Sequence, residues 1–353
     1  MKTLVIGGSR FVGLHLVREL LKDGGQVAVL NRGVTPADLP PQVERLRADR
    51  RDRAQMRSAL AGRRFDAVFD IVCEQAADAE ILAEALPGMG HYVMCSGTRI
   101  YAMADVFPVT ESSPLDPDPP ADSVGAIRLA CADLLTEAGR QHGYPVTVIR
   151  PHRIYGPDNY NLSWEPSFFA RVEQGRPIIV PGDGLNMHQW VHVDDLARSF
   201  MACVGNARSH GEVYIVAGDE IPTLNGYIRI IGEIVGKAPD VRYLDPKKVP
   251  ELERSVFPYN WDFSRIFSIQ KIADHLGWRP RIGLREGLED CYRWYKERRL
   301  DQAPWDFAYE QEVARSIPTA RRVMDSTPPQ GPEVGLIPAG DPSPAGGPGA
   351  GNP

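Results

Sequence analysis

The stretch KTLVIGGSRFVGLHLVRELL, residues 2–21, decides the fold. It opens with a short apolar run, continues through a glycine-rich turn, and then repeats apolar residues at the spacing of a helix. The pattern predicts a strand over 3–6, a turn, and a helix over 12–22. A strand, a glycine turn and a helix in immediate succession are typical of dinucleotide-binding α/β proteins.

The turn itself has the composition of a pyrophosphate site. Gly7 permits the tight turn, and Gly13 lets the helix approach the sheet. Arg10 holds the middle position of the usual glycine spacing, so close approach to the ligand must come through Gly8. The first amides of a helix are unpaired and carry partial positive charge, which favours a bound anion. We expect the pyrophosphate of a nicotinamide dinucleotide to contact Gly7, Gly8, Ser9, Arg10, Phe11, Val12 and Gly13.

Short β-branched runs alternate with amphipathic stretches through the first half of the chain, as in parallel βαβ units. The expected strands are 3–6, 26–30, 67–72, 92–95 and 145–149. The expected helices are 12–22, 55–61, 77–85 and about 122–141. Right-handed crossovers place such helices on both faces of one sheet. The predicted fold class is therefore α/β, a Rossmann-type doubly wound parallel sheet with a smaller α/β substrate-binding domain after it.

After Arg150 the pattern changes to loops punctuated by proline and glycine, with shorter helices expected at 166–173, 194–204, 224–235 and 285–298. We predict a dinucleotide-binding domain over 1–155, with a returning segment near 187–217. A mainly substrate-binding domain is predicted over 156–325. Residues 326–353 are rich in Pro, Gly and Ala, which bury too little apolar surface to offset the entropy of ordering, so they are predicted to form a disordered tail.

Composition excludes several classes of protein. The formal net charge of −6 provides no broad basic face, which disfavours nucleic acid as a partner. No stretch is long enough to cross a bilayer, so we expect no membrane contact. The five cysteines are scattered and lack a CxxC pair, which predicts reduced thiols in the cytoplasm and neither a disulfide framework nor a metal site.

The end of the second expected strand, VAVLNRG, indicates which cofactor is preferred. An acidic residue at this point would bind the ribose 2′-hydroxyl of NAD(H), but the chain has Asn31 followed by Arg32. A guanidinium here, with Arg10 across the turn, suits a 2′-phosphate, so NADP(H) is preferred and NAD(H) is the alternative. Asp49 closes a further strand between those expected at 26–30 and 67–72. It is expected either to accept from the adenine amino group or to cap the next helix.

Further motifs follow the glycine turn in order: CSGTRIY at 95–101, RPHRIYGPDN at 150–159, GRPIIVPGDG at 175–184, WVHVDDLA at 190–197 and HLGWRPRIGLREGL at 275–288. With them the chain resembles the extended short-chain dehydrogenase/reductases, also called NAD-dependent epimerase/dehydratases, over most of residues 1–300. The GGSRF turn and the stretch YGPDNYNLSWEPSFFARV look most like the branch that contains chloroplast stem-loop-binding proteins. The resemblance implies a homodimer formed through an exposed pair of helices.

The family's chemistry uses a Tyr-x-x-x-Lys pair, in which the lysine lowers the pKa of the tyrosine. The corresponding positions here are Val124 and Arg128, and the position of the family's Ser or Thr is Gly97. All three groups are therefore replaced. Arg128 is expected to hydrogen-bond the nicotinamide ribose, but a guanidinium stays protonated and cannot shuttle a proton.

Other residues at the carboxyl ends of the expected strands are candidates for the chemistry, because ligands of parallel sheets collect there. His152 is a candidate acid or base near neutral pH. Tyr101 and Thr98 lie in the CSGTRIY motif, and each has a hydroxyl that can face substrate. Cys73 follows the strand expected at 67–72, where it is either a nucleophile or a small buried residue.

Two kinds of function follow. The first is an atypical oxidoreductase that exchanges hydride between NADP(H) or NAD(H) and a small sugar-like or carbonyl substrate. The second is a catalytically silent cofactor-binding or RNA-associated protein, which the replaced catalytic positions favour and the acidic charge opposes. Epimerase or dehydratase chemistry on a nucleotide sugar is a further alternative, although His188 stands where such enzymes usually carry a diphosphate-binding arginine.

Overall fold

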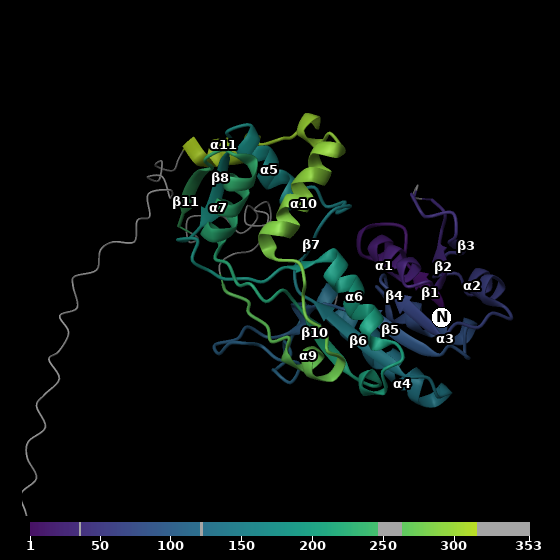
Figure 1. The fold of residues 1–353 in the computed structure, drawn as a ribbon. Helices are drawn as coiled ribbons and strands as arrows, with labels where there is room; N and C mark the ends of the chain where they lie inside the picture. Colours follow the sequence, from purple (N-terminus) through teal and green to yellow (C-terminus); the bar gives the residue numbers. More distant parts are fainter. Residues whose placement is uncertain (35–36, 121–122, 246–262, 316–353) are drawn as a thin grey trace, which may run out of the picture.

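The computed structural model describes residues 1–34, 37–120, 123–245 and 263–315, so the predicted tail at 326–353 lies outside the described residues. At its centre is a seven-stranded sheet in the order β10-β6-β5-β4-β1-β2-β3, and every neighbouring pair is parallel (Figure 1). The strands are β1 Lys2–Ile6, β2 Gln26–Asn31, β3 Glu44–Arg47, β4 Ala67–Asp70, β5 His91–Cys95, β6 Val146–Pro151 and β10 Val213–Val216.

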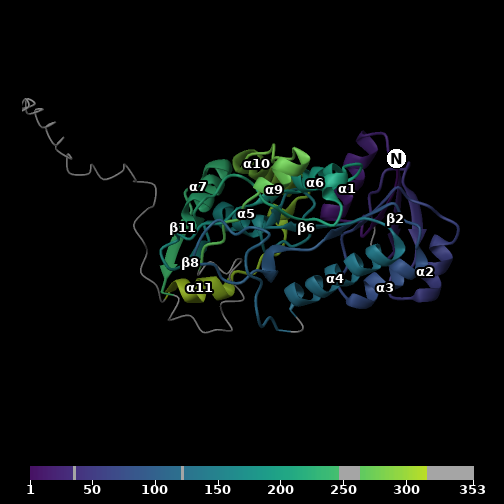
Figure 2. The ribbon, with the colours of Figure 1, turned by 90° about the horizontal axis from the view of Figure 1, so that it is seen from below.

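Helices cover both faces of this sheet, as Figure 2 shows from below. One face carries α2 Arg53–Leu60, α3 Ala76–Ala85 and α4 Val124–His142. The other face carries α1 Phe11–Lys22, α6 Val193–Cys203 and α9 Gln270–Leu276. Side chains alternate between the two cores: Val5 and Val29 pack under α1 and α6, whereas Leu4 and Leu30 pack on the opposite side. The predicted doubly wound fold class is confirmed.

The second half of the chain builds a smaller layered region beside the sheet, at the upper left of Figure 1. Two short parallel pairs join β7 with β9 and β8 with β11. Aromatic residues such as Phe169, Tyr227 and Tyr295 fill its core. Its elements are β7 Ile154–Tyr155, α5 Glu165–Glu173, β8 Pro177–Pro181, β9 Val191–His192, α7 Leu224–Val235, β11 Asp240–Leu244, α10 Leu284–Glu297 and α11 Ala308–Arg315.

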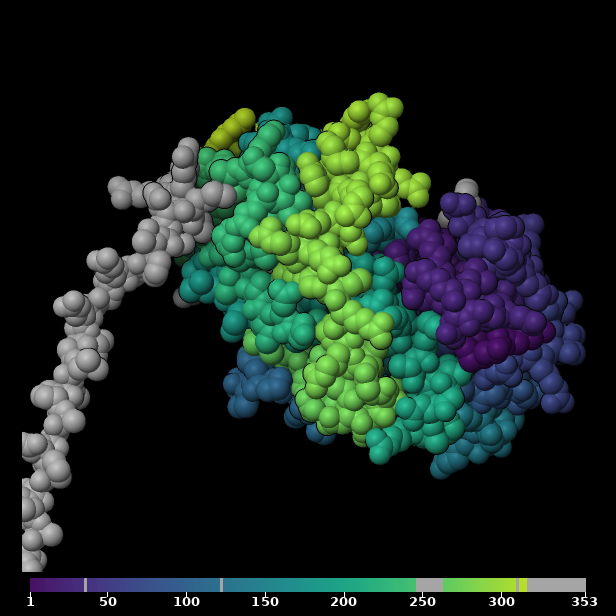
Figure 3. Space-filling model, in the orientation of Figure 1, coloured from purple at the N-terminus to yellow at the C-terminus, as the bar shows by residue number. Residues whose placement is uncertain are grey.

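The segment that carries α9 and α10 runs down the front of the molecule, between α7 and α1 (Figure 3). On α10, the Trp294 indole donates to the carboxylate of Asp158 with Nε1 and Oδ1 3.2 Å apart, and Arg18 of α1 also binds that carboxylate. Asp158 therefore connects α10 to α1, the first helix on the sheet.

Element boundaries differ slightly from the expected ones. The strand predicted over 67–72 ends at Asp70, because the buried Asp70 carboxylate accepts from the Val72 amide and forms a bidentate pair with Arg50. The long helix begins after Ser123, whose hydroxyl caps the amide of Ala126.

Two findings concern composition. All five cysteines are buried and none forms a disulfide. Among the helices in the described ranges, none combines the length and the apolar character needed to span a bilayer.

Candidate functional site

The glycine turn forms a cradle between β1 and α1. Gly7 has φ +89°, and a Cβ there would lie 2.8 Å from Val72 Cγ1. A Cβ on Gly13 would overlap the carbonyl oxygen of Gly7, so α1 reaches the turn only because residue 13 has no side chain. The N-cap residue Arg10 places no side-chain acceptor on the first-turn amides, and the first turn of α1 has no acidic residue. These features fit the pyrophosphate of a dinucleotide.

Asn31 connects the end of β2 to this turn. Its Nδ2 donates to the Ser9 hydroxyl at 2.6 Å, and its Oδ1 accepts from the Gly33 amide at 2.8 Å. The neighbouring Arg32 is exposed, and the Arg47 side chain donates from Nε to the Arg32 carbonyl at 3.1 Å. Cationic side chains therefore gather where the adenine ribose of a dinucleotide would lie.

Asp49 does not cap the helix that follows it. Its carboxylate accepts from the Arg51 amide at 3.0 Å, and its own amide donates to the Gln55 side chain. The N-cap of α2 is Asp52, whose carboxylate accepts from the Ala54 amide. Of the two roles expected for Asp49, the helix cap is therefore wrong.

Gly97, Val124 and Arg128, the three positions that we matched by sequence to the family's catalytic groups, lie close together at the end of β5 and the start of α4. The Arg128 guanidinium donates to the Ser96 carbonyl, and a Cβ on Gly97 would be 3.7 Å from Arg128 Nη1. Val124, one turn earlier on α4, is 51% exposed. The Ser96 hydroxyl is buried and has no hydrogen-bond partner within the described part of the chain.

Next to this point, His152 and Thr98 form a buried pair. Thr98 Oγ1 lies 2.9 Å from His152 Nδ1, and His152 is 6% exposed. The other ring nitrogen, Nε2, is buried without a hydrogen-bond partner among the described residues. Burial lowers the pKa of His152 well below its ordinary value, and the nearby charge of Arg153 lowers it further. The imidazole is therefore neutral near pH 7.

Two other sequence candidates are enclosed. Tyr101 is 2% exposed, and its hydroxyl accepts from Arg150 Nη1 at 2.7 Å. Burial raises the pKa of Tyr101, although Arg150 opposes the change. Cys73 is 1% exposed, and its contact with the Cys131 thiol, together with burial, raises the pKa of Cys73 strongly. The structure thus brings His152 and Thr98 together with Arg128, while Tyr101 and Cys73 pack into the core.

Arg265 belongs to this site although no motif pointed to it. Its Nη1 lies 3.4 Å from the Thr98 carbonyl oxygen, across 167 residues of sequence. The residue follows a stretch without recognisable motifs, and only the tertiary fold brings it to the end of β5. No periodic pattern in the surrounding sequence could have identified it.

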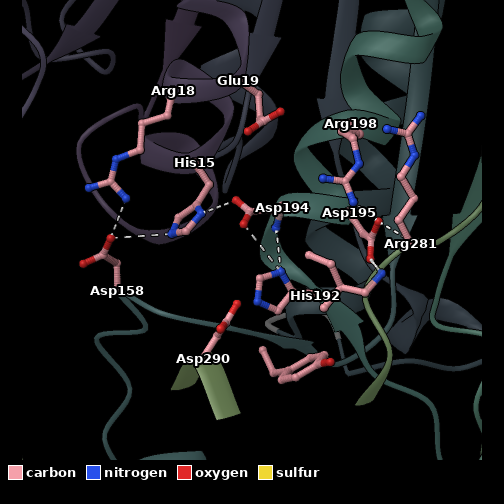
Figure 4. A network of polar contacts seen from close by, with 12 residues as sticks. His15, Arg18, Glu19, Asp158, His192, Asp194, Asp195, Arg198, Arg281 and Asp290 are labelled. Carbon is pink, nitrogen blue, oxygen red and sulfur yellow. Dashed lines mark hydrogen bonds and ion pairs between the residues drawn. The ribbon is translucent and has the colours of Figure 1, made fainter. Parts of the chain in front are cut away.

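A cluster of four side chains joins α1 to α6 and to the loop after β7 (Figure 4). We name it the Asp158 clamp; it consists of His15, Arg18, Asp158 and Asp194. His15 Nδ1 lies 2.6 Å from Asp194 Oδ1, and His15 Nε2 lies 3.5 Å from Asp158 Oδ2. Arg18 Nη1 donates to the same Asp158 oxygen at 2.7 Å.

The clamp positions Tyr160 against the glycine turn. Tyr160 is two residues after Asp158, and the Arg10 guanidinium lies over its ring, 4.4 Å from the centroid. Tyr160 is 63% exposed, so the remaining ring surface is open to a ligand or to water. The loop after β7 therefore reaches the end of the cradle where Arg10 begins α1.

Comparison with known proteins identifies the family. The model of the NAD dependent epimerase/dehydratase family matches residues 3–217, which is more than half of the chain. The chain belongs to this family. The resemblance in its ordered motifs is confirmed, and the family description agrees with a nicotinamide dinucleotide as cofactor.

Individual relatives differ in their described roles. The chloroplast stem-loop binding protein of 41 kDa b from Arabidopsis thaliana is 34% identical over 305 residues, covering 82% of this chain and 78% of that protein. A dTDP-glucose 4,6-dehydratase from Actinoplanes sp. is 28% identical, covering 85% and 99%.

Solved structures share the fold at low identity. The UDP-glucose 4-epimerase of Thermotoga maritima, with UDP-glucose, has a TM-score of 0.72 at 22% identity and covers 84% of this chain and 99% of its own. The UDP-glucuronic acid 4-epimerase of Bacillus cereus, with UDP-glucuronic acid and NAD, has a TM-score of 0.69 at 20% identity, with coverage of 84% and 99%. These likenesses establish the shared fold.

Proposed function

We propose that this protein is an oxidoreductase of the epimerase/dehydratase type that works without the Tyr-x-x-x-Lys pair. It binds NADP(H) in preference to NAD(H) and acts on a sugar-like or other carbonyl substrate, for which a nucleotide sugar is the leading class. The observation that carries this proposal is the buried Thr98–His152 pair with its unpartnered Nε2, beside Arg128 and at the carboxyl end of the sheet.

His152 is suited to the role of general base. When bound, the nicotinamide cofactor exchanges hydride with a substrate carbon. Oxidation of an alcohol also releases the hydroxyl proton, and a neutral imidazole can accept that proton at Nε2. The contact of Thr98 with Nδ1 at 2.9 Å fixes the ring orientation, and in the tautomer that carries its proton on Nδ1 the free acceptor is Nε2.

The preference for NADP(H) rests on the end of β2. Asn31 is already engaged with Ser9 and Gly33, and Arg32 and Arg47 supply positive charge beside it. A 2′-phosphate gains charge-assisted hydrogen bonds in such surroundings, whereas a 2′-hydroxyl needs an acceptor.

A second candidate function keeps the cofactor but not the chemistry. Gly97, Val124 and Arg128 replace the family's three catalytic groups, and a relative with 34% identity is described as a stem-loop binding protein. In that case the protein would be a silent cofactor-binding or RNA-associated protein. The net charge of −6 weighs against RNA.

Domain division and assembly are also part of the proposal. We divide the chain near residue 155, with 187–217 returning to the sheet, because α6 packs on α1 and β10 pairs with β6.

The neighbouring helices α3 and α4 are proposed as the surface of a homodimer, which light scattering would test. The reduced, buried cysteines favour a cytoplasmic location.

The deciding experiment follows proton and hydride exchange with a panel of nucleotide sugars. Native protein, His152→Asn and His142→Asn are each incubated with NADP⁺ or NADPH, and products are followed by nuclear magnetic resonance. His142 is exposed on α4, so its variant controls for the loss of a histidine. Turnover by the native protein and the control, with loss in His152→Asn, supports the oxidoreductase. Cofactor binding without any turnover across the panel supports the silent protein instead.

A further inference from the structure

We propose that the substrate presents a negatively charged group, a carboxylate or a phosphate, to Arg99 and Arg265 beside His152. This inference rests on the proposed function and specifies the substrate class of the same site. It concerns the reacting end of the substrate.

The two guanidinium groups come from segments far apart in sequence and belong to the same corner of the fold. Arg99 lies in the short 3₁₀ helix Thr98–Ile100, which directly follows the end of β5. Arg265 Nη1 approaches the carbonyl of Thr98, the residue before Arg99, at 3.4 Å. The hydroxyl of that same Thr98 contacts His152 Nδ1. One residue thus links both arginines to the candidate base.

Positive charge predominates at this corner. The charged side chains that lower the pKa of His152 include Arg153, Arg265 and Arg99. Arg99 and Arg265 form no ion pair with any carboxylate in the described ranges 1–34, 37–120, 123–245 and 263–315. Burial lowers the pKa of Arg265 and Arg99 lowers it further, whereas the carboxylate of Asp116, which forms no ion pair with Arg265, opposes them in part.

An anionic substrate would relieve this imbalance. Two like charges repel each other, and the half-buried guanidinium of Arg265 also loses part of its hydration, whereas Arg99 is exposed. A guanidinium offers parallel N–H groups that match the oxygens of a carboxylate or a phosphate. The buried Nε2 of His152, which has no hydrogen-bond partner among the described residues, adds an unsatisfied polar group to this corner.

The charge also bears on how His152 works. When His152 accepts a proton, it becomes a cation among Arg99, Arg153 and Arg265, which disfavours the step. An anion bound to Arg99 and Arg265 would offset their charge and make His152 a stronger base. Binding of the anionic substrate would therefore raise the basicity of His152, which acts on that same substrate. Molecules that lack the carboxylate or phosphate would react poorly.

The phosphates of the cofactor do not account for these arginines. Arg32 follows β2, whereas Arg99 follows β5, and the sheet order places β4 and β1 between those strands. Three strand spacings amount to about 14 Å. The expected 2′-phosphate site and the Arg99–Arg265 corner are therefore separate.

The test compares three sugars on the protein saturated with NADPH: D-glucose, D-glucuronate and D-glucose 6-phosphate, by calorimetry. At least one charged sugar is expected to bind about tenfold or more tightly than glucose, since a hydrogen bond to a charged group contributes about 1.5–3 kcal/mol. Arg265→Gln and Arg99→Gln should each remove most of that advantage, and Arg265→Lys should restore part of it. Arg57→Gln, on the exposed side of α2, should change nothing.

Each result decides the matter. The stronger of the two charged sugars shows whether the group is a carboxylate or a phosphate. Equal binding of all three sugars, or an advantage that survives both glutamine variants, would overturn the inference. If no sugar binds, the pKa of His152 is measured from its ring resonances with and without inorganic phosphate. A pKa that phosphate leaves unchanged overturns the inference as well. NADPH affinity is measured in the same samples. A protein that does not bind NADPH refutes the proposed function. A protein that binds NADPH but does not prefer a charged sugar refutes only this inference.

Discussion

His15 on α1 and Asp194 on α6 are 2.6 Å apart, between Nδ1 and Oδ1, although 179 residues separate them in the sequence. The same imidazole lies 3.5 Å from Asp158, which also binds Arg18. Two carboxylates therefore share one buried histidine on the helix whose first turn forms the pyrophosphate cradle. Charge on His15 should stabilise this contact between the sheet and the loop after β7.

The first prediction is that the stabilisation by His15 depends on pH. Burial lowers the pKa of His15, but the carboxylates of Asp158 and Asp194 outweigh it, so the pKa is raised from 6.5, while Arg18 opposes them. A raised pKa stabilises the fold below the unfolded value of 6.5, and this contribution is lost as pH rises through the folded value. The Tm difference between native protein and His15→Gln should be largest near about pH 6 and shrink towards about pH 9.

His142→Gln serves as the control, because His142 is exposed on α4. Its Tm should follow that of the native protein at every pH. A Tm difference for His15→Gln that stays constant across the range would show that the histidine acts only through packing.

The second prediction concerns the choice of cofactor. Arg32→Asp should reverse or erase the preference for NADPH over NADH, because it removes a cation and adds an acceptor for the ribose 2′-hydroxyl. Calorimetric titration with both cofactors measures the ratio. Arg57→Asp, which makes the same change of charge on α2, should leave the ratio unchanged. Tighter binding of NADH by the native protein would contradict the assignment.

The third prediction concerns the stack of Arg10 on Tyr160. Tyr160→Ala removes the ring that restrains Arg10 beside the cradle, so the cofactor should dissociate several-fold faster, in line with about 0.5–1 kcal/mol for an exposed cation–π contact. Tyr160→Phe keeps the ring and should behave like the native protein. Stopped-flow fluorescence of bound NADPH measures the rate. Equal rates for the alanine and phenylalanine variants would show that the stack does not hold Arg10.

Local sequence was enough to predict the fold class, five of the seven strands of the sheet and the glycine turn, but it predicted no range for β3 or β10. The helix 224–235 and the glycine turn follow from apolar spacing and from residues, such as Gly13, whose lack of a side chain is required where they stand. Strand ends were less predictable: the strand beginning at Ala67 stops at Asp70 because of a pairing with Arg50, which sequence spacing does not reveal.

The candidate site depends more heavily on contacts distant in sequence. His152 and Thr98 were both expected near the cofactor, yet their direct contact spans 54 residues. Tyr101 has the same hydroxyl chemistry as an exposed tyrosine, and only the fold shows that Arg150 and the core enclose it. Arg265 carried no signal because its role comes from the position of a loop beside Thr98.

The last prediction is that Val124→Tyr combined with Arg128→Lys will not install efficient turnover. Space is not the obstacle, because Val124 is 51% exposed. One obstacle is Gly97, which has no hydroxyl to orient a carbonyl. The other is the hydrogen bond from the Arg128 guanidinium to the Ser96 carbonyl, which a lysine would have to replace with a different geometry. Rates depend on placement of the reacting groups within fractions of an ångström.

By the same reasoning, Val124→Ala should change the native kcat by no more than a few-fold, whereas His152→Asn should lower kcat by about a hundredfold or more. Steady-state kinetics on an identified substrate measures both. If His152→Asn keeps the native kcat and the double variant gains efficient turnover, positions 124 and 128 govern the chemistry, and His152 has a structural role.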